Sequence, residues 1–203
     1  MKGFLSNFRH PRGFWGRLLL KGMNSGHAAV TAWALTHLDG LSYSLILDIG
    51  CGGGAAMVRL HAMYPESKVY GLDISEESIA FAAKTVEKEL GSVYTLTVGS
   101  AESLPYENDL FQLVTAFETI YFWPDIDGAF REVLRVLQPG GTFLIACEES
   151  RPDHTFWSDR IDGLVIYTGE ELTRHLQAAG FSTVHSVRGS GGRLCVVAAK
   201  DAE

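Results

Sequence analysis

The feature that most constrains this chain is a glycine-rich turn that directly follows a short apolar run. Residues 45–49 are apolar except for one aspartate, and the sequence continues as Gly50-Cys51-Gly52-Gly53-Gly54. Glycines between a strand and a helix let a ligand approach bare backbone, and the helix adds a positive N-terminal end. We therefore expect a buried strand over residues 45–49, a helix over residues 54–64 and a ligand at the turn between them.

Short strand patterns and helical patterns alternate along the rest of the chain. We expect further strands at residues 68–72, 93–98, 109–117, 142–147, 181–188 and 193–199, and helices at 76–90, 127–137 and 168–179. This alternation predicts an α/β fold, a mostly parallel sheet with helices on both faces. The short link over residues 189–192 is typical of a hairpin, so the last two strands should be antiparallel. Ligands of such sheets bind at the carboxyl ends of the strands.

Charge divides the chain into two unequal parts. The net charge is −7, yet residues 1–38 contain five basic side chains and no acidic one. An acidic body argues against nucleic acid as a partner, because phosphates require positive charge. We expect residues 1–40 to form a basic N-terminal arm with a lid helix, and residues 41–203 to form the ligand-binding domain.

Cysteine, histidine and hydropathy patterns exclude several classes of protein. The three cysteines are far apart and form no CxxC pair, which indicates a reducing compartment without a disulfide framework. No run of about 18 apolar residues appears, so we expect no membrane span and a cytoplasmic location. The seven histidines form no HExxH motif and no paired Cys/His spacing, so we predict no metal site.

Two aspartates bear on the identity of the ligand. Gly50, Gly52 and Ala55 match the G-x-G-x-x-G/A spacing of dinucleotide sites. Asp48, however, lies where a pyrophosphate would sit, and its carboxylate favours a cationic or zwitterionic ligand such as S-adenosylmethionine (SAM). Asp73 ends the second strand and can accept hydrogen bonds from the ribose hydroxyls of either ligand. An NAD(P)-dependent oxidoreductase therefore remains an alternative at this point.

Five motifs, taken in order, resemble those of class I SAM-dependent methyltransferases. They are LDIGCGGG (47–54), GLDIS (71–75), GSAESLPY (99–106), DLFQLVTAFETIYFWPD (109–125) and LQPGGTFLI (137–145). The resemblance runs from about Leu45 to Lys200. It implies a Rossmann-like, seven-stranded, mostly parallel sheet with an antiparallel last strand, SAM as cofactor and S-adenosylhomocysteine as product.

The resemblance also implies which residues bind the cofactor. Those expected at the methionine part of SAM are Asp48, Gly50, Cys51 and Gly52. Those expected at the adenosine part are Asp73, Ile74, Ser100, Ala101 and Glu102. Phe117 would face the sulfonium. We interpret Cys51 as a small packing residue rather than as a nucleophile.

The acceptor side is expected after the fourth strand and in the lid. Glu118 and Tyr121 are our candidate catalytic residues, and with the aromatic residues that follow they suit an amine or a small aromatic acceptor. In the lid, Met23 is expected to pack on the cofactor and Asn24 to bond its carboxylate. His27 is the third catalytic candidate, because an imidazole can act as a base near neutral pH.

We predict SN2 transfer of a methyl group from SAM to a small-molecule acceptor. Residues 116–119 lack the Asn/Asp-Pro-Pro-aromatic motif of many DNA and protein amide methyltransferases, which argues against those substrates. Besides the oxidoreductase, a SAM-binding regulatory protein without catalysis is an alternative. A homodimer is compatible with the sequence.

Overall fold

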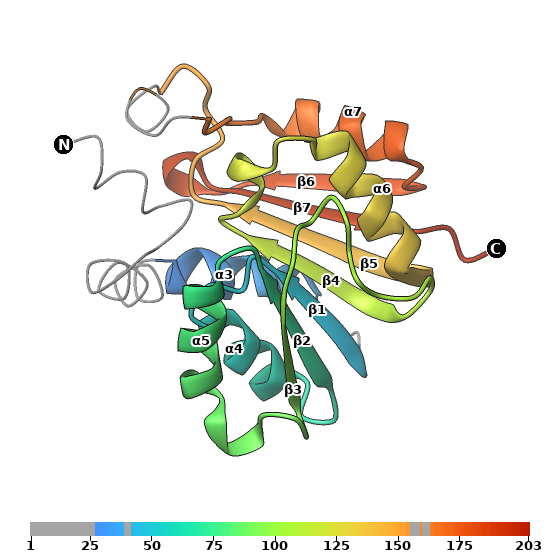
Figure 1. The fold of residues 1–203 in the computed structure, drawn as a ribbon. Helices are drawn as coiled ribbons and strands as arrows, with labels where there is room; N and C mark the ends of the chain where they lie inside the picture. Colours follow the sequence, from blue (N-terminus) through green and yellow to red (C-terminus); the bar gives the residue numbers. More distant parts are fainter. Residues whose placement is uncertain (1–26, 39–41, 155–158, 160–162) are drawn as a thin grey trace.

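The computed structural model describes residues 27–38, 42–154, 159 and 163–203 (Figure 1). Within these residues, seven strands form one sheet in the order β3-β2-β1-β4-β5-β7-β6. The strands are β1 (Leu45–Ile49), β2 (Lys68–Asp73), β3 (Tyr94–Val98), β4 (Phe111–Phe117), β5 (Leu137–Cys147), β6 (Thr183–Arg188) and β7 (Leu194–Ala199). The predicted sheet is therefore confirmed.

Strand direction also agrees with the prediction. Strand β1 pairs in parallel with β2 and β4, and the pairs β2–β3 and β4–β5 are parallel as well. Strand β7 is antiparallel to both β5 and β6. Since the chain leaves β1 toward β2 and later returns to β4 on the other side, the sheet has its switch point between β1 and β4. Ligands of open α/β sheets bind at such a point, beyond the carboxyl ends of the strands.

Helices cover both faces of the sheet. They are α3 (Ala28–Leu35), α4 (Ala55–Met63), α5 (Glu76–Thr85), α6 (Ile126–Val136) and α7 (Gly169–Ala179). Helices α6 and α7 lie side by side over one face (Figure 1), while α3 and α4 pack against the other. Successive strand residues point to opposite faces, which gives the sheet a core on each side.

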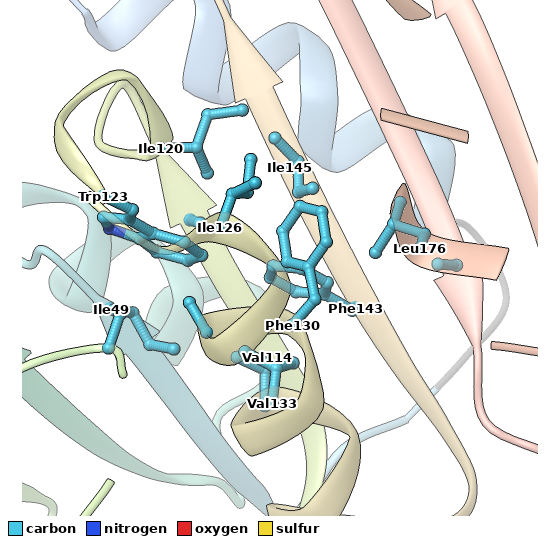
Figure 2. Packing of buried hydrophobic residues seen from close by; sticks show 14 of the residues in the cluster. Ile49, Val114, Ile120, Trp123, Ile126, Phe130, Val133, Phe143, Ile145 and Leu176 are labelled. Carbon is cyan, nitrogen blue, oxygen red and sulfur yellow. The ribbon is translucent and has the colours of Figure 1, made fainter. Parts of the chain in front are cut away.

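The first core lies between the sheet and helices α6 and α7, and Figure 2 shows part of it. Phe130 and Val133 of α6 meet Val114 and Phe143 of the sheet, and Leu176 of α7 completes the layer. All five are fully buried. Burial of one such side chain stabilises the fold by about 1.5–3 kcal/mol, so this layer fixes β4 and β5, whose ends carry the acceptor side of the site.

The second core lies on the opposite face. Val30 and Ala34 of α3 pack with Met57 and Leu60 of α4 around Ile46 of β1. The residues between 27 and 38 thereby belong to the same folded body as the sheet. The predicted boundary at residues 40 and 41 falls in 39–41, outside the described residues.

Two helix ends can be compared with the sequence. Thr168 and Glu171 form the predicted capping box of α7, and Gly180 ends that helix with a φ of 112°. The helix expected over residues 76–90 is shorter than predicted, because α5 ends at Thr85 and a 3₁₀ turn follows at Glu87–Glu89. Two β-branched residues, Thr85 and Val86, stand where the helix stops, and such residues lower helix propensity.

Among the described residues, no helix combines the length and the apolar character that crossing a bilayer requires.

Candidate active site

A cavity lies at the carboxyl ends of β1, β2 and β4, beside the switch point. Every described residue that we assigned to the cofactor lines it: Asp48, Gly50, Cys51, Gly52, Asp73, Ile74, Ser100, Ala101, Glu102 and Phe117. Two of the three catalytic candidates, His27 and Glu118, line it too. Met23 and Asn24 lie outside the described residues. The strand ends thus bring together side chains that are far apart in the sequence.

The glycine turn needs its glycines for two different reasons. Gly50 has a φ of 73°, and a Cβ atom there would lie 2.2 Å from Oγ1 of Thr119. Gly52 has a φ of 53° and faces open space, with nothing within 4 Å of an added Cβ. Left-handed backbone of this kind favours glycine. The turn therefore packs tightly against Thr119 at Gly50 and leaves room for a ligand at Gly52.

Asp73 ties the turn to the end of β2. Its Oδ2 accepts a hydrogen bond from the Gly52 amide at 2.9 Å, and its Oδ1 accepts one from the Ser75 amide at 2.9 Å. Ser75, not Asp73, caps α5, because its side chain accepts a hydrogen bond from the Ser78 amide. The carboxylate of Asp73 is therefore held in one orientation at the cavity wall, as a ribose-binding group requires.

Asp48 is a buried carboxyl group on β1. It is 1% exposed, and one of its oxygens accepts a hydrogen bond from Oγ1 of Thr115 at 2.8 Å. Burial raises the pKa of Asp48 to about 7; the Thr115 hydroxyl opposes the shift and the charge of Asp73 adds to it. A cationic ligand near Asp48 would favour the ionised form, which is consistent with the zwitterionic, sulfonium-bearing SAM.

Cys51 has the surroundings of a structural thiol. Burial raises its pKa well above the ordinary value, and the charges of Asp73 and Asp48 raise it further. Reactive cysteines need the opposite environment, one that lowers the pKa of the thiol. This supports the interpretation of Cys51 as a packing residue.

The loop after β3 offers an unused acceptor to the cavity. The Ser100 hydroxyl donates a hydrogen bond to Oε2 of Glu102, whereas Oε1 of Glu102 is buried and has no hydrogen-bond partner among the described residues. A buried acceptor without a donor is unfavourable, so a ligand that supplies an N–H group would stabilise it. An adenine amino group is such a donor, and the cavity therefore fits the nucleoside of SAM.

Glu118 occupies a strained position just after β4. Its backbone φ is 56°, which is uncommon for a residue other than glycine. Its Oε1 accepts a hydrogen bond from the Glu148 amide, and the Tyr121 hydroxyl donates one to Oε2 at 3.4 Å. Burial raises the pKa of Glu118 to about 8, and the charge of Glu148 contributes to the shift. Strained backbone persists where the surroundings hold it, and such residues cluster at functional sites.

His27 lies at the start of α3 and faces two glutamates. Its Nδ1 is 3.4 Å from Oε2 of Glu148 and 3.8 Å from Oε2 of Glu118. Burial lowers the pKa of His27, and the charge of Glu148 partly offsets that effect. His27, the lid residue with a predicted chemical role, is thus beside the glutamate that follows β4.

Tyr121 does not line the cavity, in contrast to the other two catalytic candidates. It is 7% exposed and lies in a 3₁₀ turn, Ile120–Phe122, where its hydroxyl bonds Glu118 and the backbone of Glu149. Its geometry is that of a positioning residue for Glu118.

Sequence reasoning missed three residues that the fold brings to this region. Thr119 and Thr31 line the cavity, and Glu148 contacts His27. Thr119 lies inside the motif at residues 109–125 but was assigned no role, and neither Thr31 nor Glu148 belongs to a motif. Position offered a signal for Glu148, which directly follows β5 as Glu118 follows β4.

The comparisons with known proteins identify the family. A family model described as a methyltransferase domain matches residues 42–180, more than half of the chain. This chain belongs to the methyltransferase domain family. The predicted class I, SAM-dependent methyltransferase family is confirmed with it, and the oxidoreductase alternative finds no support.

Relatives and a solved structure are consistent with the methyltransferase domain. Sterol 24-C-methyltransferase erg6 of Aspergillus fumigatus is 29% identical over 167 residues, 75% of this chain and 44% of that protein. Demethylmenaquinone methyltransferase of Lactococcus lactis is 34% identical over 125 residues, 61% of this chain and 48% of that protein. The chain spans less than half the length of these curated relatives.

A solved structure shares the fold. It is the methyltransferase bound to the Trm112 methyltransferase activator of Haloferax volcanii, with a TM-score of 0.79, 21% identity, and coverage of 90% of this chain and 93% of that one.

Proposed function

We propose that this chain transfers the methyl group of SAM to a small-molecule acceptor that binds beside Glu118. The observation that carries the proposal is one cavity whose wall joins the glycine turn, the fixed carboxylate of Asp73 and the strained Glu118. The relatives are named for sterol and demethylmenaquinone methylation, which supports a small organic acceptor.

The cofactor side depends on residues held by backbone contacts. Asp48 and the glycine turn would hold the methionine part, Asp73 the ribose hydroxyls, and Glu102 the adenine. When bound, SAM supplies an electrophilic methyl group that passes to the acceptor by in-line SN2 displacement. Because the turn is anchored to β2 through Gly52 and Asp73, these groups need little rearrangement on binding.

The acceptor side depends on Glu118 and His27. Both line the cavity where it passes from β4 to α3, and Phe122 and Trp123 contribute aromatic surface there. Glu118 would accept a hydrogen bond from the acceptor, and Tyr121 would hold the carboxylate in place. Positioning contributes most of the rate in such a displacement, with a base needed only if the acceptor must lose a proton.

Activity is tested by acceptor-dependent formation of S-adenosylhomocysteine. The chain is incubated with SAM and, separately, with hydroquinones, phenols, sterols and amines, and the product is measured by mass spectrometry. We expect turnover with one class, loss in Asp73→Ala, and no change in Glu170→Gln, an exposed control that pairs with Arg188. If no class supports turnover although S-adenosylhomocysteine binds, a non-catalytic SAM-binding protein becomes the better description.

Three further expectations belong to the proposal. We propose that residues 1–40 act as a basic arm and lid; the support is His27 at the cavity wall. A cytoplasmic location is supported by three cysteines that are all free and buried. A homodimer stays a prediction.

A further inference from the structure

Three side chains from separate parts of the chain converge at the acceptor end of the cavity. His27 precedes α3, Glu118 follows β4 and Glu148 follows β5. One potential ligand atom of each lies within 4.8 Å of the other two. We call these residues the His27–Glu118–Glu148 cluster.

Glu118, the most buried member of the cluster, is held in place by the fold. Glu118 is held from both sides, since its amide donates to the Ala146 carbonyl at 2.9 Å and its Oε1 accepts from the Glu148 amide. Its side chain is only 10% exposed. The left-handed backbone at Glu118 directs the carboxylate where an ordinary strand residue would not.

The chemistry of the cluster calls for a cation. The carboxylates of Glu118 and Glu148 share a small space. In the described part of the chain, each of them forms an ion pair with His27 and none with a lysine or an arginine. The Nδ1 atom of His27 is buried and makes no hydrogen bond within that part. Two carboxylates at close range are unfavourable without a positively charged partner. The lone pair of a neutral imidazole nitrogen that makes no hydrogen bond can ligate such a cation.

The donor set and its spacing suit a metal ion. We propose that His27, Glu118 and Glu148 bind one divalent transition-metal ion beside the cavity. One imidazole and two carboxylates match Mn²⁺, Fe²⁺ or Zn²⁺ better than Mg²⁺ or Ca²⁺, which prefer oxygen alone. Ligand bonds of about 2.1 Å place tetrahedral donor atoms about 3.4 Å apart, and the observed separations from His27 are 3.4 and 3.8 Å.

Three protein ligands leave open positions on the ion, and Glu118 and His27 place it at the cavity wall. An acceptor that carries a hydroxyl or carbonyl oxygen would bind there. This statement about the acceptor rests on the proposed function, whereas the metal site does not. The sequence predicted no metal because the three residues are 91 and 30 positions apart and form no motif.

The test is direct metal titration of the full chain without cofactor. Free Mn²⁺ is followed by electron paramagnetic resonance, and Zn²⁺ is titrated by calorimetry. We expect one ion per chain for at least one of the two metals. Affinity should fall at least tenfold in each of His27→Ala, Glu118→Gln and Glu148→Gln. The control is His175→Ala. His175 pairs with Asp127 at 2.7 Å, but it has no second carboxylate partner among the described ion pairs, so its removal should leave metal binding unchanged.

Two results would overturn the proposal. One is the absence of saturable binding of both ions, and the other is binding that the three variants leave unchanged. Glu148 is partly exposed, at 39%, so Glu148→Gln remains informative even if Glu118→Gln fails to fold. A parallel titration with S-adenosylhomocysteine separates the two proposals. If the chain binds S-adenosylhomocysteine but binds neither Mn²⁺ nor Zn²⁺, the metal site is refuted and the proposed function is not.

Discussion

Replacing Gly50 with alanine tests how the cofactor turn is built. The new Cβ would lie 2.2 Å from Oγ1 and 2.6 Å from Cβ of Thr119. The alanine would also have to adopt the left-handed backbone of Gly50, with a φ of 73°. Left-handed backbone costs about 1–2 kcal/mol, and forcing an extra carbon into a packed site costs about 1–3 kcal/mol. We therefore expect Gly50→Ala to lower the free energy of unfolding by about 2–5 kcal/mol.

Gly52→Ala is the matched control, because Gly52 has a similar backbone and no atom within 4 Å of the added Cβ. It should lose only the backbone contribution, about 1–2 kcal/mol. Denaturation by urea, without ligand, measures both. Adding Thr119→Gly should recover part of the loss in Gly50→Ala and none in Gly52→Ala. Equal destabilisation of the two alanine variants would refute the reasoning.

Two further predictions concern stability. Asp48 has a pKa of about 7 in the folded chain, against an ordinary value of 3.8. Between about pH 4 and pH 7 the folded chain therefore keeps this proton while the unfolded chain loses it. As a result, Asp48 lowers the free energy of unfolding by at most about 4 kcal/mol as the pH rises over that range. Asp48→Asn should flatten that fall in urea titrations of the ligand-free chain, and an unchanged slope would contradict the assignment. Thr168→Ala should lower the free energy of unfolding by about 1 kcal/mol, because it removes the bond from the Glu171 amide to Oγ1; an unchanged melting temperature would argue against the capping box.

The sheet could be predicted because local signals and global fold agree. Apolar runs bounded by glycines marked the strands, and the link at residues 189–192 indicated the antiparallel pair that β6 and β7 form. Since the carboxyl ends of parallel strands meet at one edge, Asp48, Asp73 and Glu118 could be placed in one cavity.

Other features depend on geometry that no spacing in the sequence encodes. The orientation of Tyr121 follows from the left-handed backbone at Glu118 and the 3₁₀ turn after it, which direct the ring into the interior. Glu148 meets His27 only because β5 lies beside β4 and α3 packs across β5. Leu90 closes the helix expected over residues 76–90, but α5 ends at Thr85, and Leu90 is 45% exposed.

The central claim is that the cavity binds SAM through the groups described above. Calorimetric titration with S-adenosylhomocysteine and, separately, with NAD tests it most directly. We predict saturable binding of S-adenosylhomocysteine, no binding of NAD, and a loss of about 1–3 kcal/mol of binding free energy in Asp73→Ala, where ribose hydroxyls lose their acceptor. Binding of NAD but not of S-adenosylhomocysteine, or unchanged affinity in Asp73→Ala, would contradict the account.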